Sequence, residues 1–264
     1  MRLATPLDLP RGSSLVVASY NIHRGVGLDR RRDLDRIAAV IEELEPDVVG
    51  LQEVIRGHGG PQADQPGYLA QRLGMNLVMG VTRELGAGAY GNAVLTRLPI
   101  VASATRDLSH GRRERRGAVR VDLAADGLVV HVFNCHFGLA FRERRRQLEL
   151  LGAFIGLCGG LAGPRILVGD FNEWHLGPVT RRFRREFASP MRRLRRTHPA
   201  VFPVFALDRI YWDADLAGED LRAHRSRLAK LASDHLPLVA RLTPRARRTP
   251  RAGYAVGDAL PPAE

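Results

Sequence analysis

Short polar clusters adjoin apolar, strand-like runs at six places in this chain of 264 residues. Reactive groups of α/β proteins gather where strands end, because the backbone is rigid there and the side chains are exposed. A single carboxylate at such a position is more often a helix cap or a turn residue, but capping alone explains six clusters poorly. The clusters are Ser19-Tyr20-Asn21, Leu51-Gln52-Glu53, Asn134-Cys135-His136, Gly169-Asp170-Phe171-Asn172, Asp208 after Phe205-Ala206-Leu207, and Ser233-Asp234-His235.

The side chains in these clusters suit a hard metal ion and phosphate chemistry. Carboxylate and amide oxygens with few imidazoles and no thiolate favour Mg²⁺ or Mn²⁺. Neither an HExxH motif nor paired CxxC motifs occur, which argues against zinc. Phosphoryl transfer needs a polarised phosphate oxygen, an oriented water and a neutralised leaving group. The donors are Glu53, Asp170, Asp208 and Asp234, the amides of Asn21 and Asn172, and the rings of His136 and His235.

Two strand–helix–strand units are predicted to position these groups. The first comprises strands Leu15–Asn21 and Val48–Glu53 around a helix at Asp33–Leu44, whose apolar residues have helical spacing. The second comprises strands Leu128–His136 and Arg165–Asp170 around a helix at Arg142–Leu157. Two such units packed face to face would bring their polar ends to one rim. Further strands are predicted at 76–80, 92–96, 118–123, 206–212 and 236–242, and further helices at 69–73 and 179–187.

Taken in order, the motifs resemble those of the endonuclease/exonuclease/phosphatase superfamily, the DNase I-like proteins. The resemblance runs from about Leu15 to Leu242 and includes Leu-Gln-Glu, Gly-Asp-Phe-Asn and Ser-Asp-His. It implies an α/β fold, a four-layered α/β sandwich of two mixed β-sheets flanked by helices. It also implies a metal-dependent phosphoric ester hydrolase. Thr197-His198-Pro199 and Leu207-Asp208-Arg209-Ile210 are similar to a compact bacterial branch.

The resemblance also assigns roles at the metal and at the phosphate. Glu53 would be the principal ligand of Mg²⁺, with Mn²⁺ as the alternative ion, and Asn21 and Asp234 would lie beside the metal. No organic cofactor is implied.

At the phosphate, Asp170 would orient and deprotonate the attacking water, and Asn172 would contact the phosphate. Asp208 would hold His235 in one tautomer, so that His235 binds or protonates a phosphoryl oxygen. His136 would contact the phosphate from the opposite side. The sequence leaves open whether His136, His235 or metal-bound water is the general acid.

Residues outside the motifs receive a structural interpretation. Glu114 is a candidate partner of His136, whereas Arg144 and Gln147 fit a family pattern that solvent exposure of the helix explains equally well. Trp174 and Trp212 flank motifs; core packing is expected for both, with a position lining the cleft as the alternative. Cys135 is expected to be buried because neighbouring strand residues face opposite ways. Loop or surface positions are expected for His23, His58, His110, His131, His175, His198 and His224.

The net charge of +12 comes almost wholly from arginine, since Lys230 is the only lysine. Such a field attracts polyanions and anionic headgroups, although compositional bias explains it equally well. A phosphodiester in nucleic acid is the first substrate hypothesis and a phospholipid headgroup the second, with peripheral contact to an anionic membrane. A non-catalytic polyanion-binding protein is the third. The clusters are Arg112/Arg113/Arg115/Arg116, Arg142/Arg144/Arg145/Arg146, Arg181/Arg182/Arg184/Arg185 and Arg192/Arg193/Arg195/Arg196.

Composition and chain length predict a cytoplasmic monomer with one main domain. A hydrophobic content of 45% is sufficient for a folded core. The two cysteines, Cys135 and Cys158, lie in apolar contexts and suggest a reduced compartment. No signal-peptide pattern precedes Ser13, and the longest apolar run, 150–164, is too short to cross a membrane. We expect an N-terminal lead over 1–13, the catalytic domain over 14–242 and a disordered, basic, proline-rich tail over 243–264.

Overall fold

Two mixed β-sheets form the centre of the protein. The computed structural model describes residues 14–60, 62–125, 127–157, 162–187 and 194–245. The predicted N-terminal lead, most of the predicted tail and Cys158 lie outside these residues. The first sheet has six strands in the order β10-β11-β1-β2-β4-β3, and the second has five in the order β5-β6-β7-β8-β9. The strands are β1 (Leu15–Asn21), β2 (Val48–Arg56), β3 (Asn76–Leu85), β4 (Gly88–Thr96), β5 (Ile100–Asp107), β6 (Gly117–Ala125), β7 (Leu128–His136), β8 (Arg165–Asp170), β9 (Asp208–Trp212), β10 (Leu216–Ala223) and β11 (Leu238–Pro244).

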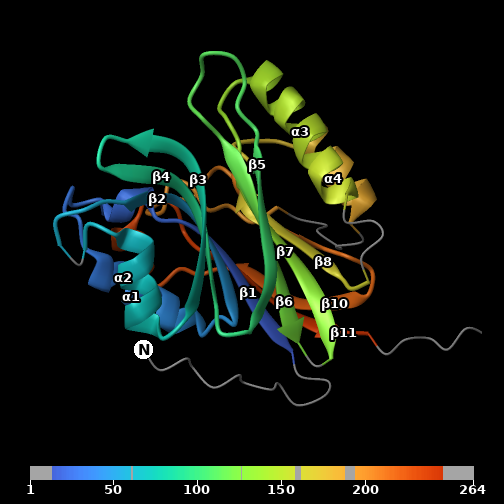
Figure 1. Cartoon of the computed structure of the whole chain (residues 1–264), viewed down its shortest axis with the longest axis horizontal. Coiled ribbons are helices and arrows are strands. Elements are labelled where there is room, and N and C mark those ends of the chain that lie inside the picture. Colours follow the sequence, from blue (N-terminus) through green and yellow to red (C-terminus); the bar gives the residue numbers. More distant parts are fainter. Residues whose placement is uncertain (1–13, 61, 126, 158–161, 188–193, 246–264) are drawn as a thin grey trace, which may run out of the picture.

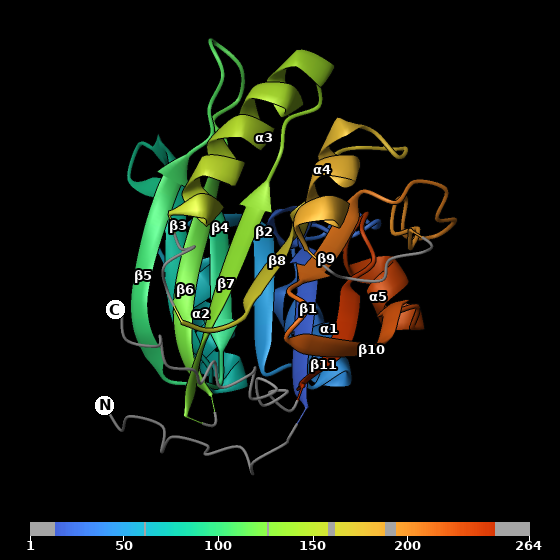
Figure 2. The same cartoon turned by 90° about the vertical axis from the view of Figure 1, so that its right-hand side faces the viewer.

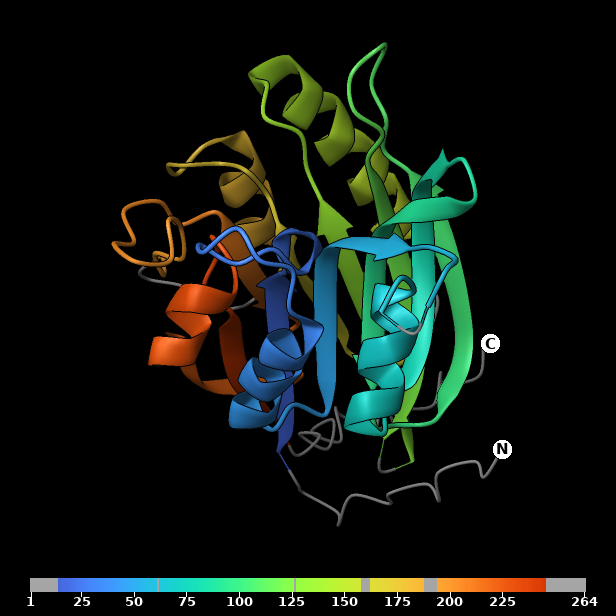
Figure 3. The same ribbon diagram turned by 90° about the vertical axis from the view of Figure 1, so that its left-hand side faces the viewer.

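Helices cover the outer face of each sheet, so the fold has four layers (Figure 1). On the second sheet lie α3 (Phe141–Gly156) and α4 (Pro178–Glu186), which face the viewer in Figure 2. On the first lie α1 (Leu34–Leu44), α2 (Gln65–Leu73) and the short α5 (Arg227–Ala232), visible in Figure 3 in blue, cyan and orange-red. This arrangement confirms the predicted α/β sandwich. No helix in the described residues is long and apolar enough to cross a membrane.

Three apolar cores correspond to the three contacts between layers. Ile37, Ile41 and Leu69 pack the first helical layer against its sheet. Val17, Val121 and Ile166 belong to the cluster between the two sheets. Phe133, Leu151 and Phe183 belong to the cluster under α3 and α4. Each sheet therefore buries both faces, as the nearly continuous apolar runs of β1 and β7 indicate.

A buried polar contact joins the sheets directly below the strand ends. The amide nitrogen of Gln52 donates to Ser19 Oγ at 3.3 Å and to Asn134 Oδ1 at 2.7 Å. Asn134 in turn donates to the carbonyl groups of Leu51 and Ala93, both on the first sheet. A Cβ at Gly50 would lie 2.9 Å from the Asn134 side chain, so the close approach requires glycine. Ser19, Gln52 and Asn134 therefore hold the sheets in register instead of contributing reactive groups.

The two predicted strand–helix–strand units are present and bring their polar ends to one edge. β1 pairs in parallel with β2, and β7 pairs in parallel with β8. In the second sheet His136 is opposite Asp170, and Asp170 is opposite Asp208 on the antiparallel β9. Carboxyl ends of parallel strands meet at one sheet edge, so the residues that follow them become neighbours.

Three elements were not predicted because they bury little apolar surface. β5 is an edge strand whose residues are almost all exposed. β10 is also an edge strand, and the charged residues Glu219, Asp220 and Arg222 interrupt its apolar pattern. Helix α5 has only six residues, fewer than two turns, so its apolar periodicity is too short to detect. β11 continues through Thr243 and Pro244, two residues that were expected to belong to the tail.

Candidate active site

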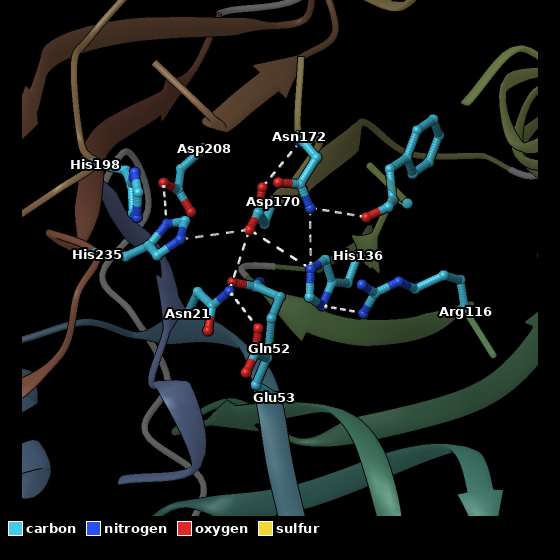
Figure 4. A network of polar contacts seen from close by, with 12 residues as sticks. Asn21, Gln52, Glu53, Arg116, His136, Asp170, Asn172, His198, Asp208 and His235 are labelled. Atoms are coloured by element: carbon cyan, nitrogen blue, oxygen red, sulfur yellow. Dashed lines mark hydrogen bonds and ion pairs between the residues drawn. The ribbon is translucent and has the colours of Figure 1, made fainter. Parts of the chain in front are cut away.

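All six polar clusters contribute to one cleft at the edge where the parallel strands end (Figure 4). The cleft encloses about 350 Å³ between the two sheets' loops. Its floor is formed by Asn21 and Glu53 from the first sheet and by His136, Asp170 and Asn172 from the second. His235, which precedes β11, forms one wall. The predicted convergence of distant side chains is therefore present in the structure.

Asp170 lies at the centre of this cleft and is almost completely buried. Its Oδ2 accepts a hydrogen bond from the Asn21 amide at 3.1 Å. The same oxygen lies 3.6 Å from His136 Nε2 and 3.8 Å from His235 Nε2. Its Oδ1 accepts the backbone N–H of Asn172 at 2.9 Å. A carboxylate held between two imidazoles can accept a proton and orient a water between them.

A β-bulge directs Glu53 into the cleft. The pairing of β2 with β4 shifts between Leu51 and Val54, and Glu53 has a φ of +58°. A left-handed conformation is uncommon for glutamate and costs roughly 1–3 kcal/mol, so it persists only where the surroundings enforce it. Strain of this kind concentrates at functional sites.

The charge around Glu53 fits a bound cation. Burial raises the pKa of Glu53, and the carboxylates of Asp170 and Asp234 raise it further, against the lowering effect of Asn21 and His23. A divalent cation would remove this penalty, and the donors are hard oxygens. Among the described residues no cysteine faces the cleft, because Cys135 is buried in the core beneath α3, as predicted. The residues present therefore fit Mg²⁺ or Mn²⁺.

The other two predicted metal neighbours are placed differently. Asn21 turns its amide nitrogen toward Glu53 at 3.3 Å and Asp170 at 3.1 Å. Its oxygen accepts the backbone N–H of His23 at 3.0 Å. Asn21 would therefore have to rotate its amide to offer oxygen to a metal. Asp234 is partly exposed and is not among the residues that line the cleft; it lies 3.7 Å from His23 Nδ1 and 3.8 Å from His198 Nε2.

Asp208 and His235 form a buried acid–imidazole pair. Asp208 Oδ2 lies 3.0 Å from His235 Nδ1 and accepts the Thr197 hydroxyl at 2.5 Å. Burial alone lowers the pKa of His235, but Asp208, Asp170 and Asp234 outweigh it and raise the pKa to about 10. The ring is thus positively charged at neutral pH, with Nδ1–H toward Asp208 and Nε2–H toward the cleft.

His136, in contrast, is neutral at neutral pH. Burial lowers its pKa to about 3, and the nearby Arg116 guanidinium contributes to the shift. Arg116 Nη1 lies 3.1 Å from His136 Nδ1 and can only donate, so Nδ1 accepts and the ring proton is on Nε2. Glu114 is bonded to Arg116 Nη2 at 2.9 Å and not to the ring. The prediction that Glu114 pairs with His136 is therefore wrong, because the intervening arginine takes that position.

The sequence profile of the Endonuclease/Exonuclease/phosphatase family matches residues 18–235, which include every cleft residue described above. The chain belongs to this family. Members of the family are hydrolases of the phosphatase and nuclease types, and they typically use a divalent metal. The chain is also 31% identical over 252 residues to the uncharacterized protein YbhP of Escherichia coli, covering 89% of this chain and 98% of YbhP.

Solved structures of the endonuclease/exonuclease/phosphatase fold superimpose on this one. A family member from Beutenbergia cavernae is 25% identical, with a TM-score of 0.70 over 88% of this chain and 72% of that one. A mannosyl-6-phosphatase from Bacteroides thetaiotaomicron has a TM-score of 0.71 at 19% identity, over 87% of this chain and 99% of that one. At that identity the likeness concerns the fold alone.

Two residues of this family member were not expected to line the cleft. His198 was expected to be a loop or surface residue outside the site; it does lie in a loop, and it lines the cleft with its ring 4.7 Å from that of His235. Burial lowers the pKa of His198, and the charged His235 lowers it further. Trp174 was expected in the core, but it is 61% exposed and lines the cleft against Phe205. Their proximity to the Thr-x-Pro and Gly-Asp-Phe-Asn motifs was the available signal.

Several residues near the site anchor its loops. The buried Glu173 carboxylate accepts the backbone N–H groups of Val179 and Thr180, and so caps α4. Arg209 is buried and donates to the carbonyl groups of Glu173 and Ala206, which ties the loops before α4 and β9 together. The Asn172 amide nitrogen donates to the Phe137 carbonyl at 2.9 Å and lies 3.2 Å from His136 Nε2, so it contacts both the loop after β7 and the cleft.

The remaining side-chain predictions have mixed outcomes. Trp212 is buried in the core as expected. His131 is buried and pairs with Asp122 at 2.7 Å, which corrects its expected surface position. Arg144 is partly buried and donates to the Leu139 carbonyl, and the buried Gln147 accepts the Gly138 N–H at 2.8 Å. Both therefore contact the loop after β7, Gln147 from a buried position and Arg144 from a partly exposed one.

Proposed function

We propose that this protein is a Mg²⁺-dependent phosphodiester hydrolase, a nuclease or a related phosphodiesterase, that uses activated water. The observation that carries the proposal is the position of Asp170 between a carboxylate–amide pair and two imidazoles of opposite protonation state. A pure binding module has no use for a buried carboxylate that faces both a neutral and a charged histidine.

In the proposed reaction, the oxygen of a water attacks phosphorus in line with the leaving oxygen. Asp170 takes the proton that the water loses, and the P–O bond to the leaving group breaks. The leaving oxygen receives the proton that His235 holds on Nε2, which Asp208 stabilises from the other side of the ring. Products are a phosphomonoester and an alcohol, and protons balance once Asp170 and His235 re-equilibrate with solvent.

His136 contributes as a neutral donor. Arg116 places the ring proton on Nε2, which lies 3.2 Å from Asn172 Nδ2; a phosphoryl oxygen that took the place of this contact would accept a hydrogen bond from Nε2–H. A cation held by Glu53, with Asp234 and a rotated Asn21 beside it, would neutralise charge on the phosphate and its leaving group. Asn172 would hold the loop after β8 against the loop after β7, and its backbone N–H would orient the Asp170 carboxylate toward the water.

The isosteric Glu53→Gln substitution tests the cation site without any substrate. In wild type, Mg²⁺ at about one hundred times Kd should add about 2.7 kcal/mol to the free energy of unfolding. In Glu53→Gln most of this gain should disappear, while the ion-free protein unfolds at the same or a higher temperature because repulsion with Asp170 and Asp234 is relieved. Thermal unfolding with Mg²⁺ and with EDTA measures both effects. An equal Mg²⁺ gain in the two proteins would place the cation elsewhere.

The reaction type is tested by an activity panel over plasmid DNA, RNA, phospholipid vesicles and a bis-aryl phosphate, each with Mg²⁺ and with EDTA. We expect cleavage of a diester with Mg²⁺ only, and its loss in His235→Ala. His224→Ala is the matched control, because His224 pairs with Glu43 at the surface, outside the cleft. Tight DNA binding without turnover would favour the polyanion-binding alternative. Activity that survives both EDTA and His235→Ala would contradict the mechanism.

A further inference from the structure

Exposed apolar side chains are concentrated around the mouth of the cleft. Fifteen large apolar side chains are exposed in the described residues, and six of them form what we call the apolar rim. Phe202 is 76% exposed and Val201 60%, values that core packing cannot explain. Large exposed apolar patches on soluble proteins usually mark a docking surface. The rim consists of Leu139, Trp174, Leu176, Val201, Phe202 and Phe205.

The sheet topology places this rim at one end of the molecule. Leu139 follows β7, Trp174 and Leu176 follow β8, and residues 201–205 lie shortly before β9. Because β7 is parallel to β8 and β9 is antiparallel to both, these three loops leave the sheet at the same edge. Trp174, Leu139 and Phe205 themselves line the cleft. The rim therefore borders the opening of the cleft on the side of the second sheet.

The loop that carries Val201 and Phe202 is held rigidly. The N–H groups of Val204 and Phe205 both donate to the His198 carbonyl, at 3.0 and 2.8 Å. Ala200 is buried and its N–H donates to the Asp234 carbonyl at 2.7 Å. Beside it, the rings of Trp174 and Phe205 are in contact with centroids 5.3 Å apart. A preorganised loop presents apolar groups without a further entropy cost on docking.

Arginines flank the rim. Arg142 and Arg145 are exposed on the first turns of α3, next to Leu139. Arg195 and Arg196 are exposed immediately before Thr197 and His198. The acidic side chains near these arginines have other partners: Glu143 lies 3.9 Å from Arg113 and Glu114 is bonded to Arg116, while the cleft carboxylates belong to the proposed cation site. Apolar tips within a basic surround are complementary to an anionic lipid bilayer.

We propose that the apolar rim docks this protein onto an anionic lipid surface, with the cleft facing the headgroups. Leu139, Leu176 and Val201 are aliphatic and cannot stack on nucleobases, so the rim suits acyl chains better than single-stranded nucleic acid. Docking would place headgroup phosphates at the cleft. This consequence rests on the proposed hydrolytic function, whereas docking itself does not.

Vesicle co-sedimentation in EDTA tests docking while hydrolysis is suppressed. Wild type should bind phosphatidylcholine vesicles that contain phosphatidylglycerol, and bind far less to phosphatidylcholine alone. The Val201→Ser/Phe202→Ser variant should lose about tenfold or more in apparent affinity, because it no longer buries two apolar side chains. Tryptophan emission should shift to the blue on binding. Trp212 is buried, so the shift reports on the exposed Trp174.

Val101→Ser/Leu157→Ser is the matched control, since Val101 is 60% and Leu157 77% exposed. Val101 lies at the far end of β5 and Leu157 just past the far end of α3, both away from the cleft, and this variant should bind like wild type. Equal binding by both variants, or an unshifted Trp174 emission, would overturn the proposal. So would Trp174 quenching by single-stranded DNA together with absent vesicle binding, which would assign the rim to nucleic acid. None of these measurements depends on turnover. A negative docking result would therefore not bear on the hydrolytic proposal, which the activity panel tests separately.

Discussion

Asp170→Asn is expected to lower kcat by about 10²–10⁴-fold, the range of a lost general base. Asparagine keeps the shape of the side chain and can still accept the Asn172 N–H that Asp170 Oδ1 accepts at 2.9 Å. It cannot take a proton from water, and it removes the negative charge that lies 3.6 and 3.8 Å from the two histidines. The loss should therefore appear in kcat more than in KM. Steady-state kinetics with Mg²⁺ on the diester cleaved fastest by wild type measures it.

Asp122→Asn provides a matched control for this substitution. Asp122 is also a buried carboxylate that faces a histidine, with its Oδ1 2.7 Å from His131 Nδ1, but it does not line the cleft. Its removal should affect the free energy of unfolding and leave kcat within a few-fold of wild type. A variant Asp170→Asn that is folded and turns over at the wild-type rate would exclude Asp170 as the base.

Asp208→Asn is expected to lower the pKa of His235 substantially from its raised value of about 10 in the ion-free protein. Asp208 is the largest of the charges that keep the ring protonated against the opposing effect of burial. Histidine NMR titration in EDTA measures the shift directly. With Mg²⁺, the alkaline fall in activity should move to lower pH, because the protonated ring is lost earlier.

The free energy of unfolding should also depend on pH through the raised pKa of His235. The folded-state pKa of His235 lies above its ordinary value of 6.5, so its stabilising contribution is complete below about pH 6.5 and is lost as the pH rises toward 10. In EDTA, the free energy of unfolding of wild type should therefore decline across this window more steeply than that of Asp208→Asn.

A surface variant controls for general charge effects. Glu43→Gln removes a carboxylate 2.6 Å from His224 and should leave the His235 titration unchanged. A wild-type His235 that titrates near 6.5 would contradict the charged state assigned to it, and with it the proposed proton donor.

The sequence determined the fold and the identity of most cleft residues. The mostly apolar runs at Leu15–Asn21 and Leu128–His136 predict buried strands, and the spacing of apolar residues in Asp33–Leu44 predicts an amphipathic helix; the structure has both. Polar residues at the ends of such strands must meet at one sheet edge. The local sequence pattern therefore predicts where Glu53, His136, Asp170 and His235 lie, because each is part of a predicted strand or adjoins one.

Tertiary structure alone decided which group each residue faces. Arg116 lies beside His136 only because β6 pairs with β7, and sequence separation cannot distinguish it from Glu114. His198 and Trp174 lie in loops whose paths depend on contacts with distant segments, including the Ala200 N–H bond to Asp234. The protonation of the two histidines depends on burial and on charges across both sheets. The pKa of each histidine thus adds contributions from residues of many elements, and no single stretch of sequence contains all of those residues.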